Sequence, residues 1–207
     1  MSDNLGLRDR KKLETWRAIH DAAVTLFLEH GYEAVRVNDI AKAARVTPST
    51  FFNYFTTKES VVFDPDPADL ATVRELLARR PSGEDPWTSL REVLLGYLAL
   101  TGPLLVTQKK LKASSPVLAD CGRELGDRVR EVLVDWTAER HPDLPALRAL
   151  LLINLSMAAV LTSFSVWDPG AGVSEFFAMA RDCLDQAAAG VAPAGTGRER
   201  DLAGERP

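Results

Sequence analysis

The sequence predicts an all-α protein, built from a small N-terminal helix-turn-helix domain and a larger helical domain. Apolar side chains recur at spacings of three and four residues through most of the chain, which is the period of an amphipathic helix. Alternating apolar and polar residues bounded by turns, which would indicate strands, are missing. Clusters of proline, glycine and serine divide the periodic stretches into segments of helical length.

The composition is that of an ordinary globular chain. Of its 207 residues, 46% are hydrophobic and 26% are charged, which excludes wholesale disorder and allows a sizeable core. The formal net charge of −4 argues against binding nucleic acid through overall charge alone. Cys121 and Cys183 belong to no Cys/His cluster, so we expect reduced thiols, no metal site and no cofactor.

The charge is unevenly distributed along the chain. Residues 1–60 contain nine Lys/Arg against eight Asp/Glu, whereas residues 61–207 contain 16 against 21. Arg8, Arg10, Lys11 and Lys12 form a basic cluster near the N-terminus. The N-terminal third is therefore the part expected to face a polyanion. Arg8, Arg10 and Lys11 are a candidate DNA arm, in the adjacent minor groove or along the backbone, with a solvated tail as the alternative.

One stretch is long and apolar enough to be compared with a membrane span. Residues 149–167 are 19 residues without a charge. They include Asn154 and several Ser and Thr residues, and the polar N-terminus shows no apolar signal region. We therefore expect a buried helix in a cytoplasmic protein that has no membrane partner.

The N-terminal domain is predicted over residues 10–63, after a flexible basic arm at residues 1–9. An amphipathic helix over 10–30 ends at Gly31. Two short helices over 37–44 and 48–54 are joined by a tight turn at Arg45 and Val46. Thr47 is a good N-cap and Pro48 a good first helical residue. A further short helix over 58–63 ends at the proline-rich residues 64–67.

The second domain is predicted over residues 67–189, followed by a disordered tail at 190–207. Its helices are expected over 67–79, 87–101, 103–112, 116–139, 143–167 and 172–189. Turn residues separate most of these segments. The second of these segments is expected to end at residue 101, and the third to begin at Pro103.

Two helices as short as 37–44 and 48–54 bury little surface alone, so they need the 10–30 helix behind them. The apolar side chains available for a shared core are Trp16, Phe27, Ile40, Val46, Phe51 and Phe55. Such a three-helix unit is the helix-turn-helix arrangement, whose last helix lies in the major groove of DNA. A plain helical corner with a solvated polar face is the alternative that periodicity alone leaves open.

The 48–54 helix carries side chains suited to DNA. Its outer side is expected to show Pro48, Ser49, Thr50, Asn53 and Tyr54, with Lys58 shortly after. Asn pairs with adenine edges, Ser and Thr pair with several bases, and a proline ring packs on the thymine methyl group. Tyr54 and Lys58 are natural partners of phosphates, which fix the position of a protein without reading sequence.

Three segments of the N-terminal third share a pattern with known proteins. They read FLEHGY at residues 27–32, VNDIAKAARVTPSTFFNYF at 37–55 and KE at 58–59. Over residues 13–60 the chain resembles the TetR family of bacterial transcriptional regulators. The FFNYF segment, followed by Val-Val-Phe and an Asp/Pro break, looks like an actinobacterial branch that includes mycofactocin-type regulators.

The resemblance implies a homodimer whose N-terminal domains each read half of a pseudo-palindromic DNA operator. Each C-terminal domain would bind a small effector, a hydrophobic molecule or an acyl thioester, that releases the DNA, so the chain would most often act as a repressor. By position, the resemblance adds Arg36, Val37, Asn38 and Thr47 to the DNA contacts. It places Lys58 at the start of the next helix, where a phosphate is commonly held.

Three residues depart from the family pattern. Arg36 stands where a capping Thr or Ser is common, so it either weakens the cap or grips a phosphate directly. Arg45 stands where the turn often has Gly, and a positive φ there would cost Arg about 1 kcal/mol. Phe52 replaces a common Tyr, which removes a hydroxyl that could reach a phosphate.

Two further sets of residues are predicted in the C-terminal domain. Small residues on the 143–167 helix and apolar residues on the last helix suggest a four-helix dimer interface, with an intramolecular core as the alternative. That interface set is Leu152, Ser156, Ala159, Ser163, Phe176, Phe177, Ala180 and Leu184. The candidate effector pocket, with core packing as the alternative, is lined by Leu94, Tyr97, Leu98, Thr101, Trp136, Asn154, Met157, Leu161 and Phe164.

The sequence does not predict an enzyme. The three histidines His20, His30 and His141 are scattered, and no nucleophile elbow, phosphate loop or metal-ligand spacing is present. Lys109, Lys110 and Lys112 form a basic group that either holds an anionic head group or is simply solvated. The alternative to a regulator is a small-molecule-binding or protein-interaction module whose DNA binding is weak or lost.

Overall fold

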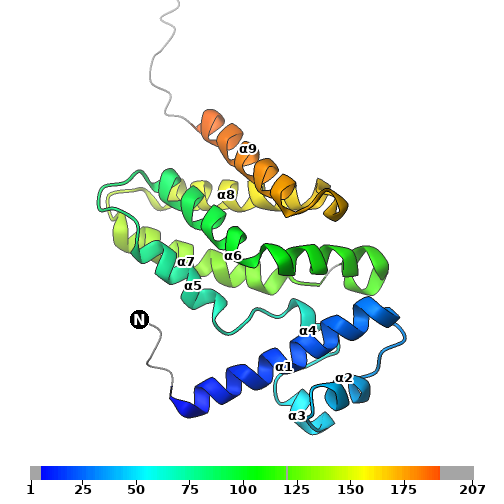
Figure 1. Cartoon of the computed structure of the whole chain (residues 1–207). Helices are drawn as coiled ribbons and strands as arrows, with labels where there is room; N and C mark the ends of the chain where they lie inside the picture. Colours follow the sequence, from blue (N-terminus) through cyan, green and yellow to red (C-terminus); the bar gives the residue numbers. More distant parts are fainter. Residues whose placement is uncertain (1–5, 120, 192–207) are drawn as a thin grey trace, which may run out of the picture.

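The computed structural model describes residues 6–119 and 121–191 (Figure 1). Within them the chain forms α-helices and two single 3₁₀ turns, with no strand. The N-terminal helices are α1 (Leu7–His30), α2 (Val37–Ala43), α3 (Pro48–Phe52) and α4 (Ser60–Phe63). The rest are α5 (Asp69–Ala78), α6 (Pro86–Ser114), η1 (Pro116–Leu118), α7 (Arg123–Arg140), α8 (Ala146–Val166), η2 (Pro169–Ala171) and α9 (Val173–Val191). The all-α prediction is confirmed.

The N-terminal helices enclose one apolar core. Trp16, Ile19, Ala23 and Phe27 lie on one side of α1 and are buried at the spacing of an amphipathic helix. Ile40 of α2, Phe51 of α3 and Phe55 just after α3 also belong to this core. As predicted, Gly31 ends α1 with a positive φ of 80°, and the rings of Phe27 and Tyr32 meet edge to face.

The C-terminal helices form a stack above the N-terminal domain, with α8 and α9 farthest from α3 (Figure 1). One apolar cluster joins side chains of α5, α6, α7 and α8. A smaller cluster around Trp167 and Phe176 joins α6, α8 and α9. The expected boundaries of α5, α8 and α9 differ from the observed ones by a few residues, whereas the expected 116–139 helix is η1 followed by α7.

The predicted break at Pro103 is wrong, because α6 runs through it for 29 residues. A proline disfavours helical geometry in the residue before it mainly by a clash with that residue's Cβ. Gly102 has no Cβ, so the helix continues. The absence of a side chain at Gly102 also lets α9 pack close to α6, since a Cβ there would lie 2.7 Å from the Val173 side chain.

The two regions share more structure than the predicted boundary at residues 63–67 suggests. Leu111 of α6 and Leu118 of η1 are buried in the core of the N-terminal domain. The Gln108 side chain donates a hydrogen bond to the Val62 carbonyl at 2.9 Å, and the Ser115 hydroxyl donates to Glu33 at 3.0 Å. The end of α6 is therefore built into the N-terminal domain.

Helices α6 and α8 are long and apolar enough to cross a membrane, judged by length and composition alone. Both pack against neighbouring helices of the chain. Only 28% of the most apolar stretch of α8 is buried inside the chain, so this helix leaves a large apolar face uncovered.

Candidate DNA-contact surface and C-terminal helices

The turn before α3 adopts the geometry that the sequence suggested. Arg45 has a φ of 57°, the one positive φ among the non-glycine residues that the structure describes. The Thr47 side chain caps α3 by accepting a hydrogen bond from the Thr50 amide at 3.0 Å, and Pro48 is the first helical residue. This turn fixes the direction in which α3 leaves α2.

Helix α3 presents a mixed face to solvent. Phe51 is fully buried, whereas Pro48, Ser49, Phe52 and Asn53 are exposed. Residues 48 and 52 lie one helical turn apart, as do residues 49 and 53, because Asn53 keeps helical φ and ψ. The outer surface of α3 therefore carries an apolar stripe beside a polar one.

Three of the predicted DNA-contact side chains are less available than expected. The hydroxyls of Thr47 and Thr50 lie 2.8 Å apart and bind each other at the start of α3. Tyr54 is half-buried against the N-terminal core and lies beyond the end of α3, which stops at Phe52 rather than at residue 54.

The start of α2 is capped despite the missing Thr or Ser. The Asp39 carboxylate accepts a hydrogen bond from the backbone N–H of Arg36 at 2.9 Å, which ties down the first turn. This leaves the Arg36 and Asn38 side chains exposed, while Val37 packs partly against the core. The exposed pair lies at the end of α2 where backbone amides point outward.

Lys58 is bound within the fold rather than free, and its predicted contact with a phosphate stays a prediction. Its ammonium group donates hydrogen bonds to the carbonyls of Tyr32 at 2.8 Å and Val35 at 3.0 Å. It also lies 3.7 Å from the centre of the Tyr32 ring. Helix α4 begins only at Ser60. Lys58 therefore fastens the loop between α1 and α2.

Tyr32 and Glu59 form a second link in the same place. The Tyr32 hydroxyl donates a hydrogen bond to the Glu59 carboxylate. Burial and this carboxylate raise the pKa of Tyr32 above its ordinary value. Burial alone would raise the pKa of Glu59, but the hydrogen bond from Tyr32 and the other donors hold it below its ordinary value. Glu59 thus stays ionised as part of the fold.

The basic cluster near the N-terminus is helical rather than a flexible arm. Helix α1 begins at Leu7, so Arg8, Arg10 and Lys11 lie on its first two turns, all exposed. A helix is too wide for the minor groove of ordinary DNA. Residues 1–5 of the predicted arm and residues 192–207 of the predicted tail lie outside the described residues.

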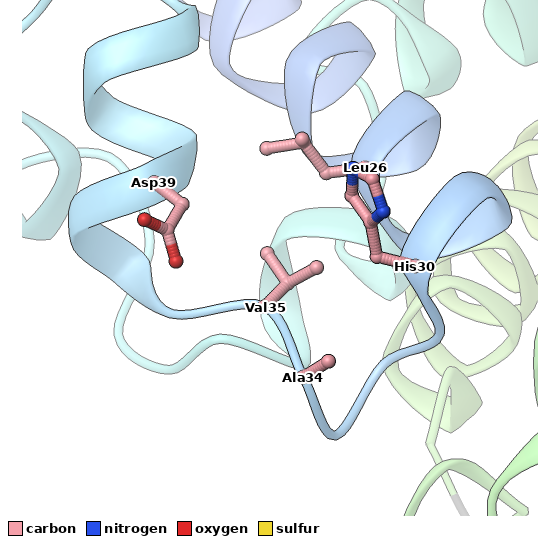
Figure 2. Close-up of a pocket in the computed structure, with 5 residues that line it drawn as sticks. All are labelled: Leu26, His30, Ala34, Val35 and Asp39. Atoms are coloured by element: carbon pink, nitrogen blue, oxygen red, sulfur yellow. The ribbon is translucent and has the colours of Figure 1, made fainter.

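An open pocket of about 490 Å³ lies on the N-terminal domain (Figure 2). Leu26 and His30 of α1 face Asp39 of α2 across it, with Ala34 and Val35 on the connecting loop. The Asp39 carboxylate is already held by the Arg36 amide. None of the predicted effector-pocket residues lines this pocket.

The predicted effector-pocket residues are divided between the core and the surface. Leu94, Tyr97 and Leu98 are buried, and Trp136, Met157 and Phe164 are partly buried against apolar clusters. Thr101 donates a hydrogen bond to the Tyr97 carbonyl. Two residues are corrected: Leu161 is 61% exposed, and the exposed Asn154 side chain accepts a hydrogen bond from Arg130. Both point away from the core.

Tyr97 is the notable polar group within the C-terminal core. Burial and the neighbouring Asp69 carboxylate raise its pKa above the ordinary value. Burial and the charge of Asp66 in turn raise the pKa of Asp69. Asp66 pairs with Arg17 of α1 at 2.9 Å, so this group of side chains lies where α5 and α6 meet the N-terminal domain.

The predicted dimer residues are used inside the chain instead, which corrects that assignment. Phe177 is partly buried within the single chain. The other seven are fully buried there: Leu152, Ser156, Ala159, Ser163, Phe176, Ala180 and Leu184. Small residues on α8 allow α9 to pack closely along it, and the Ser156 and Ser163 hydroxyls bond to carbonyls one turn earlier. The sequence showed a close helix contact but not which chain supplies the second helix.

The lysines of α6 are also largely used within the fold. Lys109 donates to the Phe164 and Ser165 carbonyls at the end of α8, and its ammonium lies 5.0 Å from the centre of the Phe164 ring. Lys112 donates to the Ala119 and Cys121 carbonyls. Of the three, Lys110 alone is classed as exposed. The group therefore caps main-chain carbonyls rather than forming a site for an anionic head group.

Taken together, the capped α3 on a three-helix core defines a helix-turn-helix DNA-binding protein with a helical second region. The model of the bacterial regulatory proteins of the tetR family matches residues 19–64, which span this unit. This match places the helix-turn-helix domain in the TetR family, a family of regulatory proteins rather than enzymes.

Relatives of known sequence match part of the chain. The regulator TcmR of Streptomyces glaucescens is 42% identical over 81 residues, which cover 39% of this chain and 36% of TcmR. The chain thus spans only about a third of that relative. A mycofactocin biosynthesis transcriptional regulator, MftR of Mycobacterium tuberculosis, is 28% identical over 134 residues, covering 63% of this chain and 68% of MftR.

Solved structures share the whole fold at low sequence identity. A TetR/AcrR-type transcriptional regulator from Aquifex aeolicus has a TM-score of 0.53 and 16% identity, covering 83% of this chain and 98% of its own. The regulator FadR of Bacillus subtilis, solved with stearoyl-CoA, has a TM-score of 0.52 and 19% identity, covering 84% and 98%. These likenesses confirm the arrangement of a helix-turn-helix domain followed by a helical domain.

Proposed function

We propose that this chain is a cytoplasmic transcriptional repressor that binds a pseudo-palindromic DNA operator as a homodimer and leaves it when a small hydrophobic effector binds. The observation that carries the proposal is the surface of α3. Ser49 and Asn53 form an exposed polar stripe on a short helix that is capped at Thr47 and backed by the buried Phe51. Such a stripe suits the edges of bases in the major groove.

The test is selection of binding sites from a random pool of DNA duplexes by the purified chain at about 150 mM salt. An enriched palindrome, with half-sites one or two helical turns apart, is the expected result for a dimer. Weak, salt-sensitive binding to all duplexes would contradict the proposal. It would favour a small-molecule-binding or protein-interaction module that has lost sequence-specific DNA binding.

The uncovered face of α8 supports the homodimer. Leu147, Leu151, Ala158, Leu161 and Ser165 recur at spacings that place them on one side of the helix, and all are exposed in the single chain. The three leucines are 82%, 51% and 61% exposed. Apolar surface of this extent on a helix that already packs against α7 and α9 is typical of a protein–protein interface.

Replacing one leucine tests this interface. Leu161→Glu should shift the sedimentation coefficient from that of a dimer to that of a monomer. Leu100→Glu is the matched control, because Leu100 on α6 is 64% exposed but lies outside the α8 face. A Leu161→Glu protein that remains dimeric at the same concentration would exclude this face of α8.

The basic start of α1 is proposed to lie along the DNA backbone. Arg8, Arg10 and Lys11 are exposed, and no ion pair within the described part of the chain engages them. Replacing all three with alanine should lower the slope of log affinity against log salt by about 0.9 for each phosphate that these side chains neutralise in the parent protein. An unchanged slope would show that the first turns of α1 do not touch DNA.

The effector is proposed to enter the C-terminal core near α6. Buried apolar side chains with one polar anchor are the usual lining of such sites, and Leu94 and Leu98 flank Tyr97 here. The B. subtilis protein of the same fold was solved with stearoyl-CoA, which favours an acyl thioester. Stearoyl-CoA should therefore release the selected operator in a mobility-shift assay, and free CoA should not. Release by neither compound would contradict the acyl class.

A further inference from the structure

Phe52 stands apart from the other aromatic residues of the N-terminal domain. Within residues 6–63, six of the other aromatic side chains are buried and Tyr54 is half-buried. Phe52 is 56% exposed. Its ring lies 5.3 Å from the buried Phe51 ring between centres, at an angle of 83°. The phenyl group therefore projects from the end of α3 into solvent.

The position of Phe52 on α3 determines which surface its side chain shares with other residues. Pro48 lies one turn before it and is also exposed, so the two side chains form one apolar stripe. The polar stripe of Ser49 and Asn53 lies beside it on the same outward surface. Any duplex that Ser49 and Asn53 touch is therefore also within reach of the Pro48–Phe52 stripe.

The chemistry of the stripe selects one feature of the major groove. Neither a proline ring nor a phenyl ring can donate or accept a conventional hydrogen bond, so neither can read the polar edges of bases. The C5 methyl group of thymine is the apolar group that the bases of the major groove present, and apolar side chains including Phe recognise it. Burying that methyl against a ring is favourable.

We propose that Phe52, with Pro48, is a specificity-determining residue that reads thymine methyl groups in each half of the operator. This inference rests on the proposed function and adds a base preference to it. Thymine is expected in each half-site next to the base that Asn53 reads. A tyrosine hydroxyl at this position would instead offer a polar contact, so the phenyl ring shifts recognition from the backbone toward the base.

The test uses the full-length protein and the operator obtained from the random duplex pool. Each thymine of the half-site is replaced in turn by deoxyuridine, which removes only the methyl group. For the unmodified protein, one such position should weaken binding by about fourfold for each methyl removed. Phe52→Ala should bind the parent operator about tenfold more weakly and should no longer distinguish thymine from deoxyuridine there.

Two variants keep the result specific to the ring. Phe52→Leu retains an apolar group and should keep part of the methyl preference. Ser49→Ala alters the polar stripe, so it should lower affinity yet keep the full difference between thymine and deoxyuridine. The melting temperature of Phe52→Ala should match that of the unmodified protein, because most of the side chain is already in solvent.

The outcomes distinguish failure of the proposed role of Phe52 from failure of the proposed function as a regulator. A selected operator that tolerates deoxyuridine at every thymine, or lacks thymine in its half-sites, would overturn the role of Phe52 and leave the regulator intact. The same methyl penalty in Phe52→Ala as in the parent would also overturn it. A pool without any enriched sequence would overturn the proposed function and, with it, the role of Phe52.

Discussion

The two regions of this molecule are held in shape by different kinds of contact. In the N-terminal domain, α2, α3 and α4 have seven, five and four residues, too few to be stable alone. Side chains of Thr47, Lys58 and Asp39 therefore fasten the ends and loops of these helices to the backbone. The C-terminal helices are longer and meet mainly through apolar side chains.

This difference between the regions shows where a sequence is informative about structure. A cap or a strained turn is a local event, so its residue type and position can be read directly. An apolar face on a long helix is not local, because any apolar partner of matching shape can cover it. Mutations should therefore act through polar fastening in one region and through packing in the other.

The largest effect is expected from Lys58→Met. Removing the ammonium leaves the carbonyls of Tyr32 and Val35 without the donor that both now use. We expect the free energy of unfolding to fall by about 3 kcal/mol, since hydrogen bonds from a charged group to partly buried carbonyls are removed. Urea unfolding measures this change. Lys42→Met is the control, because Lys42 is exposed at the end of α2.

The same variant distinguishes a fastening role from a phosphate contact. If Lys58 only holds the loop, the salt dependence of the remaining DNA binding should keep its slope. A stable Lys58→Met protein with a slope reduced by about one unit would place the lysine on DNA instead.

The packing side of the comparison is tested by Gly102→Ala. A Cβ there would approach the Val173 side chain to 2.7 Å and the Phe177 ring to 3.0 Å. Helices α6 and α9 would have to move apart, and the new Cβ would also crowd Pro103, at a combined cost of about 2 kcal/mol in unfolding free energy. Gly96→Ala on the same helix is the matched control, since its Cβ would meet Leu76 at an ordinary 3.4 Å.

Gly96→Ala should be neutral or slightly stabilising, because alanine favours the helix more than glycine does. Equal losses of stability in the two variants would show that α6 tolerates no change at either glycine, and that the packing against α9 is not the cause.

Features that act within a few residues were predicted correctly, whereas contacts between distant residues were not. Thr47, Pro48, Gly31 and the strain at Arg45 were predictable, because each acts on backbone within a few residues. The hydrogen bonds of Lys58 were not predictable, since its carbonyl partners lie 23 and 26 residues away. Family patterns for a phosphate contact could not reveal that the same ammonium reaches back to the loop.

In the C-terminal region the small-residue stripe was visible but its partner was not. Ser156 and Ala159 allow close approach whether the second helix is α9 or a helix of another chain. The leucines on the opposite side of α8, such as Leu151 and Leu161, are exposed in the single chain and carry the proposed contact with a second copy. A helix that is apolar all round must be covered on both sides.

A smaller effect is expected from an ion pair between α5 and α6. The Arg80 guanidinium and the Ser89 hydroxyl donate to Glu84, at 2.7 Å and 2.6 Å for one oxygen, and lower the pKa of Glu84 from 4.5 to about 2. A lowered pKa stabilises the fold above pH 4.5, and this contribution disappears as the pH falls toward 2.

Glu84→Gln should therefore be less stable than the parent at pH 7, with the difference shrinking on acidification. Urea midpoints at neutral and acidic pH measure it. Glu75→Gln serves as control, because its pair with Arg79 is exposed and 3.7 Å long and should show little difference at either pH. A constant difference for Glu84→Gln across the range would assign it to packing rather than charge.

The smallest expected effect is a gain in the free energy of unfolding, from a substitution in the turn between α2 and α3. Arg45 has a φ of 57°, a conformation that costs most side chains about 1 kcal/mol but that Asn adopts more readily. Arg45→Asn should therefore raise the unfolding free energy by about 0.5 kcal/mol.

Arg45→Gly relieves the same strain but makes the unfolded chain more flexible, so its net effect should be near zero. Lys42→Asn, inside α2, should instead be slightly destabilising through lower helix propensity. If Arg45→Asn proved as destabilising as Lys42→Asn, the arginine side chain would be making an interaction that outweighs its backbone strain.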